Sequence, residues 1–277
     1  MSYKVAASHT TGSVTQSLPP LSDLRQACTD LAEAAAVEIM RIYGGDLGVR
    51  NKADKSPVTD ADHAAELVIV AGLRALAPGV PVVAEEEMAA GHVPKLDGGP
   101  FWLVDPLDGT KEFIKRNGEF TVNIALIENG RPTLGIVLAP ATGMLWRGAA
   151  GLGADKREGT GGFTAITTRT PPPQGLTACA SRSHAIYSDL DIWFRNNNLT
   201  VADRVQAGSS LKFCLIAEGK ADIYPRFGPT NEWDTAAGQG VLEAAGGEVV
   251  TTDDRPLLYG KPRFSNPHFI ARSLAAR

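Results

Sequence analysis

Two apolar, β-branched runs joined by Asn129-Gly130 constrain the fold more than any other feature of this sequence. The runs cover residues 120–128 and 133–139. An Asn-Gly pair between two such runs is the strongest short-range signal for a β-hairpin. A third run, residues 144–149, follows the turn residues Thr142-Gly143. The middle of the chain is therefore predicted to form an antiparallel sheet.

Two amphipathic helices are predicted before this sheet. In the first, Ser22 is expected as the N-cap, and apolar residues recur at helical spacing from Leu24 to Ile42, before Gly44-Gly45. Thr59 is expected to cap a second helix that runs to about Ala77. Both helices should pack against the central sheet.

The proline run Pro171–Pro173 predicts a stiff linker and a domain boundary. We expect residues 1–20 to be a mobile tail, residues 21–173 an N-terminal α+β domain, and residues 174–277 a smaller α/β domain. The C-terminal part alternates predicted strands and helices, which indicates α/β character. Its expected strands are 176–180, 221–225 and 248–251. Its expected helices are 185–197, a helix opened by Gly208-Ser209-Ser210 that runs through residue 217, and 233–245.

Composition narrows the class of protein. Hydrophobic residues make up 43% and charged residues 21%, as in soluble globular proteins, and the net charge of -4 provides no basic surface for nucleic acid. The three cysteines are far apart, which favours reduced thiols and a cytoplasmic location. We expect no integral membrane segment, because no run of about 18 apolar residues occurs.

The hexapeptide Asp105–Thr110 places two carboxylates three residues apart, directly after the apolar strand predicted over residues 101–104. Crowded carboxylates repel one another, so either one pKa rises or a cation binds between them. Oxygen ligands suit magnesium or calcium. The alternative is structural, because Asp-Pro and Asp-Gly are common turn dipeptides.

Further acids occur at the predicted end of a strand or the predicted start of a helix. Glu85 follows the strand predicted over residues 80–84, Asp62 lies in the first turn of the second helix, and Asp234 is expected at a helix start. If these acids converge, two or more divalent ions could share them and hold a phosphate. Gly109-Thr110 could open a helix whose free N–H groups bind phosphate oxygens, although Thr110 could equally be a simple cap.

Three motifs in order carry a family resemblance: Glu85-Glu86, Asp105–Thr110 and Trp233-Asp234. With them, the chain from about Leu21 onward resembles the lithium-sensitive, magnesium-dependent sugar-phosphatase superfamily that includes inositol monophosphatase and fructose-1,6-bisphosphatase. The resemblance implies a layered αβαβα fold. Four further segments resemble the CysQ-type 3'(2'),5'-bisphosphate nucleotidases: Lys111–Phe113, Ser181–His184, Gly208–Phe213 and Tyr224–Asn231.

The resemblance also implies roles for individual residues. It implies two or three Mg²⁺ ions: one on Glu85, Asp105 and the Leu107 carbonyl, one on Asp105, Asp108 and Asp234, and a weaker one on Glu85. Thr110, supported by Asp62, would orient the attacking water. The substrate phosphate would lie against Asp108, Gly109 and Thr110, beside the metal ligands. The nucleotide would be held by His184, Ser209, Lys212 and Arg226.

The function implied is a phosphomonoesterase that removes the 3'-phosphate of adenosine 3',5'-bisphosphate by metal-activated water, yielding AMP. Its sulfated form, 3'-phosphoadenosine 5'-phosphosulfate, is a further candidate substrate. Two alternatives remain open: an inositol or other sugar phosphatase of the same superfamily, and a non-catalytic binding module on this fold. By resemblance alone, peripheral association with the inner face of the membrane is compatible with a cytoplasmic enzyme.

Overall fold

A seven-stranded sheet forms the centre of the computed structural model, which describes residues 18–52, 55–181 and 187–276. Its strand order is β3-β4-β5-β6-β7-β8-β9, and every neighbouring pair is antiparallel except the parallel pair β3–β4. The predicted hairpin is confirmed, and Asn129 and Gly130 both have positive φ, as a type I′ turn requires. The strands are β3 (Val82–Ala84), β4 (Phe101–Asp108), β5 (Thr121–Glu128), β6 (Arg131–Ala139), β7 (Met144–Ala149), β8 (Gly153–Glu158) and β9 (Thr164–Ile166).

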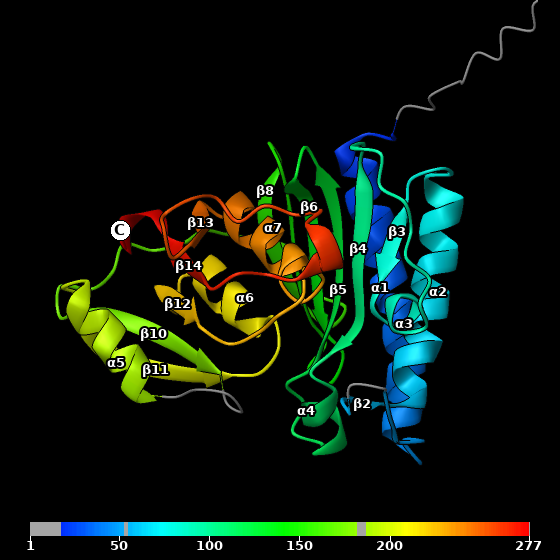
Figure 1. The fold of residues 1–277 in the computed structure, drawn as a ribbon, viewed down its shortest axis with the longest axis horizontal. Coiled ribbons are helices and arrows are strands. Elements are labelled where there is room, and N and C mark those ends of the chain that lie inside the picture. The colour runs from blue at the N-terminus through cyan, green and yellow to red at the C-terminus, as the bar shows by residue number, and fades with distance from the viewer. Residues whose placement is uncertain (1–17, 53–54, 182–186, 277) are drawn as a thin grey trace, which may run out of the picture.

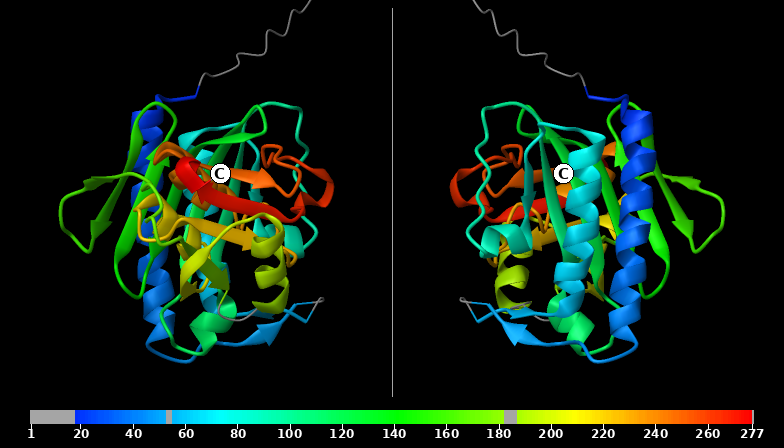
Figure 2. Two further views of the ribbon diagram at one scale, coloured as in Figure 1. Left: turned by 90° about the vertical axis from the view of Figure 1, so that its left-hand side faces the viewer. Right: turned by 90° about the vertical axis from the view of Figure 1, so that its right-hand side faces the viewer.

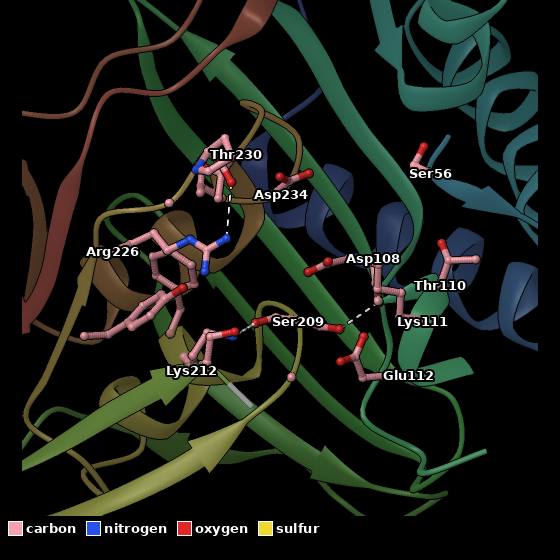
Figure 3. A pocket seen from close by; sticks show the side chains of 18 of the residues that line it. Ser56, Asp108, Thr110, Lys111, Glu112, Ser209, Lys212, Arg226, Thr230 and Asp234 are labelled. Carbon is pink, nitrogen blue, oxygen red and sulfur yellow. Dashed lines mark hydrogen bonds between the residues drawn. The ribbon is translucent and has the colours of Figure 1, made fainter. Parts of the chain in front are cut away.

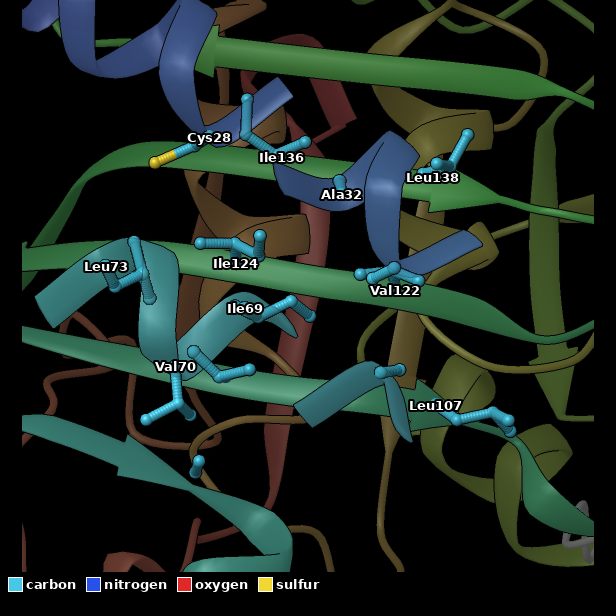
Figure 4. Packing of buried hydrophobic residues seen from close by; sticks show 14 of the residues in the cluster. Cys28, Ala32, Ile69, Val70, Leu73, Leu107, Val122, Ile124, Ile136 and Leu138 are labelled. Atoms are coloured by element: carbon cyan, nitrogen blue, oxygen red, sulfur yellow. The ribbon is translucent and has the colours of Figure 1, made fainter. Parts of the chain in front are cut away.

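Two helices cover one face of this sheet. α1 (Leu21–Tyr43) packs on β6 and α2 (Asp60–Leu76) packs on β4, and they lie side by side in the right-hand view of Figure 2. Their apolar stripes and the inward side chains of the sheet form a first core cluster (Figure 4). Thr59 caps α2 as predicted, whereas Ser22 as the N-cap of α1 is wrong. Pro20 holds the N-cap position because its fixed φ suits a helix entrance, and the Ser22 hydroxyl bonds to Asp23.

A second sheet of five strands, ordered β11-β10-β12-β14-β13, completes a layered αβαβα architecture (Figures 1 and 2). α6 (Leu211–Ala217) and α7 (Ala236–Ala244) lie between the two sheets, and α5 (Tyr187–Asn196) covers the outer face of the second. The predicted fold class is thereby confirmed. The strands are β10 (Leu176–Ser181), β11 (Val201–Ala207), β12 (Ile223–Arg226), β13 (Gly247–Thr251) and β14 (Phe269–Ser273).

The layer between the sheets is packed very closely. A Cβ on Gly135 of β6 would stand 2.2 Å from the carbonyl oxygen of Ala237 in α7, so helix and strand touch backbone to backbone. The second core cluster includes Val137 and Trp146 from before the proline run and Phe213 and Val241 from after it. Both parts of the chain therefore share one core, and the domain boundary near Pro171–Pro173 stays a prediction.

Shorter elements shape the edge of the molecule. They are β1 (Arg50–Asn51), β2 (Pro57–Val58), α3 (Glu85–Ala89), α4 (Thr110–Ile114) and two 3₁₀ turns, Pro262–Phe264 and Leu274–Ala276. The helix expected from Trp233 begins later, at Ala236, which leaves Asp234 in the preceding turn. In the described ranges, no helix combines the length and apolarity needed to cross a bilayer. Of the expected tail, residues 1–17 lie outside those ranges.

Candidate active site

A pocket of about 720 Å³ opens where the first sheet meets the layer that contains α6 (Figure 3). One side is formed by the end of β4 and the start of α4, and the opposite side by β12 and the turn before α7. Of the predicted site residues, eight line it: Glu85, Asp108, Gly109, Thr110, Ser209, Lys212, Arg226 and Asp234. Asp62, Asp105 and Leu107 are buried directly behind them, and His184 lies outside the described residues.

The hexapeptide changes from strand to helix within six residues. Asp105 pairs with Asn123 and Asp108 with Thr121, and the register shifts between the two pairs. Such a bulge re-aims side chains, while the Leu107 side chain stays in the first core cluster (Figure 4). Gly109 then adopts a φ of 93° as the N-cap of α4. The chain therefore bends so that Asp108 and Thr110 both face the pocket.

Four carboxylates from three parts of the chain come close at this bend. Because β3 runs parallel to β4, Glu85 follows the end of β3 beside Asp105, as expected from sequence. Burial and the charges of Glu85, Asp108 and Asp234 raise the pKa of Asp105 well above its ordinary value. Burial and repulsion from Asp108 do the same to the pKa of Asp234. Glu85, Asp108 and Asp234 all line the pocket, and Asp105 is buried beside them, so the four acids belong to one cluster.

Asp62 and Thr110 form a hydrogen-bonded pair beside the cluster. The Thr110 hydroxyl donates to Asp62 Oδ1 at 3.2 Å. Asp62 Oδ2 accepts from the backbone N–H and the hydroxyl of Thr59, at 2.8 and 2.6 Å, and so closes the capping box of α2. The position of the Thr110 hydroxyl is thus set by the first turn of a long helix.

Ser209 connects the C-terminal part of the chain to the hexapeptide. Its hydroxyl lies 2.7 Å from the carbonyl oxygen of Asp108 and 2.8 Å from that of Glu119. A Cβ on Gly109 would stand 2.3 Å from the same hydroxyl oxygen, so the contact also requires glycine there. In this structure the Ser209 hydroxyl therefore lies at the pocket lining and is hydrogen-bonded to the hexapeptide.

Two cations face the acids across the pocket. Lys212 is buried, and its Nζ donates to the carbonyl oxygens of Ala207, at 3.1 Å, and Ser209. Burial lowers the pKa of Lys212 to about 8, although the nearby Asp108 partly offsets that effect. Arg226 donates from Nη2 to the Pro229 carbonyl, and its buried Nε has no hydrogen-bond partner among the described residues. The pocket thus has an acidic side and a basic side.

Lys52 is a residue that the sequence interpretation did not include. Its Nζ lies 2.6 Å from Glu85 Oε1 and 2.6 Å from Glu86 Oε1, so an internal cation neutralises part of the acidic cluster. Asp234 Oδ2 meanwhile accepts from the backbone of Asn231. With the acids so engaged, no three Asp, Glu, His or Cys side chains of the described ranges stand in a metal-binding arrangement.

The cluster nevertheless suits a divalent cation. Its donors are all oxygens, and burial together with the charges of neighbouring acids raises the pKa values of Asp105, Asp108 and Asp234, which is the situation that a hard cation relieves. Glu85 would have to leave Lys52 to become a ligand. Glu85, Asp105, Asp108 and Asp234, with the Leu107 carbonyl, are the groups that would hold such ions.

Comparisons with known proteins agree with this site. The model of the inositol monophosphatase family matches residues 21–276. The 3'(2'),5'-bisphosphate nucleotidases CysQ of Shigella flexneri and Escherichia coli K12 are each 48% identical over 250 residues, which is 89% of this chain and 98% of theirs. The crystal structure of CysQ from Bacteroides thetaiotaomicron has a TM-score of 0.76 and 38% identity, and the match covers 91% of this chain and 97% of that one.

The αβαβα layers and an acidic cluster at the end of β4 define a protein of the phosphatase type, and the chain belongs to the inositol monophosphatase family. A more distant solved relative, the inositol monophosphatase from Anabaena, has a TM-score of 0.73 at 26% identity, with 92% of both chains covered. The resemblance to the CysQ-type branch is confirmed by the higher identities of the CysQ proteins.

Proposed function

We propose that this protein is a magnesium-dependent 3'(2'),5'-bisphosphate nucleotidase that converts adenosine 3',5'-bisphosphate to AMP and phosphate. The observation that carries the proposal is the two-sided pocket, with the cluster of carboxylates on one side and Lys212 and Arg226 on the other. A substrate with two phosphates needs a cationic site for the one that does not react. The activity named for the 48% identical CysQ proteins supports it.

The reacting 3'-phosphate is assigned to the acidic side. When bound to the acids there, magnesium would neutralise the phosphate charge, activate water and stabilise the leaving ribose oxygen. Thr110 donates its hydroxyl proton to Asp62, so its oxygen would accept a hydrogen bond from the attacking water and so align it. The backbone N–H groups at the start of α4, after Gly109, would hold phosphate oxygens.

The 5'-phosphate is assigned to the basic side. The Arg226 guanidinium lines this side of the pocket, and Lys212 keeps its charge at neutral pH because its pKa stays near 8. The sulfate ester of 3'-phosphoadenosine 5'-phosphosulfate would occupy the same side, which makes that nucleotide a second expected substrate. Ser209 would act through Asp108 and not by direct contact with the nucleotide.

The test is phosphate release from a panel of substrates with magnesium, with and without lithium. The panel contains adenosine 3',5'-bisphosphate, its sulfated form, inositol 1-phosphate and fructose 1,6-bisphosphate. We expect the two nucleotides to be preferred and Asp105→Asn to abolish turnover. A clear preference for inositol 1-phosphate would establish the alternative sugar phosphatase, and full turnover by Asp105→Asn would contradict the metal assignment.

A further inference from the structure

Glu66 is a buried carboxylate that the reaction described above does not use. It lies on α2, its side chain is almost completely excluded from solvent, and it stands among the apolar residues of the buried stripe of that helix. Glu66 Oε2 accepts from the backbone N–H of Glu86 at 2.7 Å, and Oε1 accepts from that of Glu87 at 2.8 Å. Both carboxylate oxygens are therefore occupied by consecutive backbone donors.

These two donors belong to the residues that directly follow Glu85. β3 ends at Ala84 and α3 begins at Glu85, so the N–H groups of Glu86 and Glu87 have no partner within their own helix. Glu66 satisfies both of them. Because the two peptide groups are held on α2, the direction in which the Glu85 side chain leaves the end of β3 is also set.

The same helix, α2, also carries Asp62, which positions Thr110. Asp62, four residues before Glu66, accepts from the Thr110 hydroxyl. Residues four apart lie one above the other on a helix, separated by about 6 Å along its axis. One rigid helix therefore contacts both the residue that aligns water and the segment that presents Glu85.

Burying the charged form of the Glu66 carboxylate is energetically unfavourable. Burial, together with the charges of Glu86 and Glu87, raises the pKa of Glu66 to about 7, so its charged form is disfavoured where it stands. An amide of the same shape has only one acceptor oxygen and could satisfy one of the two N–H groups. Only a carboxylate or a larger rearrangement can satisfy both.

We propose that Glu66 is a positioning residue, which fixes Glu85 relative to the Asp62–Thr110 pair by binding the backbone N–H groups of Glu86 and Glu87. The inference rests on the proposed function only in assigning Glu85 to a metal. Removing Glu66 should therefore weaken cation binding by about tenfold to a hundredfold, the range typical of groups that orient metal ligands. The effect on kcat at saturating metal should be smaller.

The experiment is a calorimetric titration of the metal-stripped full chain with Mn²⁺, for the parent protein and for Glu66→Ala and Glu66→Gln. We expect Kd to rise in the order parent, Gln variant, Ala variant. Asp222→Asn is the matched control, because Asp222 is also fully buried and accepts a backbone N–H, from Thr177 at 2.7 Å, but lies outside the pocket lining. It should lower thermal stability and leave the Mn²⁺ Kd unchanged.

A parent-like Mn²⁺ Kd in a folded Glu66→Ala or Glu66→Gln protein would overturn the proposal, and so would an equal loss in Asp222→Asn. If Glu66→Ala does not fold, Glu66→Gln decides, because it keeps one of the two hydrogen bonds. Failure of the proposed substrate in the panel leaves this result unaffected, since metal binding is measured without substrate. A parent chain that binds no Mn²⁺ would overturn both this proposal and the metal assignment.

Discussion

Thr110 is the single residue whose side chain we assign to aligning water, and its hydroxyl can be removed without changing its shape. Thr110→Val should lower kcat about a hundredfold to ten-thousandfold, the range typical of general acid–base groups, and leave Mn²⁺ binding unchanged. Thr110→Ser keeps the hydroxyl and should retain most of the rate. Steady-state kinetics at saturating magnesium measure both. A valine variant with parent-like kcat would remove Thr110 from the mechanism.

Arg226 tests the assignment of the second phosphate. Arg226→Met should raise KM for adenosine 3',5'-bisphosphate about tenfold to a hundredfold, as expected for the loss of a charged hydrogen bond. KM for 3'-AMP, which lacks the 5'-phosphate, should change little. Arg255→Met is the control, because Arg255 is highly exposed and pairs only locally with Asp253. Equal losses for both nucleotides would place Arg226 elsewhere in the reaction.

At the scale of single residues, sequence reasoning located the acids but not their partners. Glu85 and Asp105 could be placed together because each follows a predicted strand, and strand ends at one edge of a sheet meet. Lys52 and Glu66 carried no comparable signal. Each contacts residues that are distant in the sequence and become neighbours only in the folded chain. Such long-range contacts produce no periodic pattern in the sequence.

At the scale of elements, the contact between α7 and β6 determines where Asp234 lies. Asp234 is two residues before α7, and Gly135 of β6 lets that helix approach to backbone contact. Gly135→Ala should lower the free energy of unfolding by about 1–3 kcal/mol, because the added methyl meets the Ala237 carbonyl. It should also weaken Mn²⁺ binding by displacing Asp234.

Urea unfolding and Mn²⁺ titration measure the two effects of Gly135→Ala. Gly162→Ala is the matched control, because a Cβ there has no heavy atom within 4 Å and should change neither quantity. If Gly135→Ala lowers stability and leaves Mn²⁺ affinity intact, then α7 does not position Asp234.

Elements with strong local signals were predicted well. The Asn129-Gly130 hairpin and the Thr59 cap have local causes, and both are confirmed. β11 was not predicted, because it is a mostly exposed edge strand with charged residues and little alternation. Its pairing is set by β10, a partner that local sequence does not reveal.

At the scale of the whole molecule, the acidic cluster should make the metal-free protein less stable as pH rises. In the folded chain, burial raises the pKa of Asp108 to about 6 and that of Glu66 to about 7, whereas unfolded carboxyls titrate near 4. Between about pH 4 and pH 7 the folded state therefore binds more protons than the unfolded state. Raising the pH across this range lowers the free energy of unfolding.

The measurement is Tm against pH, in EDTA and in excess magnesium. In EDTA we expect Tm to fall by about 5 °C or more between pH 5 and pH 7. Magnesium binds the ionised carboxylates, so it should raise Tm most at the higher pH. A metal-free Tm that rises over this interval would show that folding does not raise the pKa values of these acids.

The backbone contact between α7 and β6 also predicts that the chain cannot be split into two separately soluble fragments. A cut within the segment 170–175 would separate α6 and α7 from the sheet that they cover, and would leave side chains such as Trp146 and Phe213 facing water on each fragment. The two fragments, expressed separately, should be insoluble, and co-expression should recover a soluble complex. That result would make the proline run a surface connection within a single folding unit, whereas two soluble separate fragments would support the predicted domain boundary.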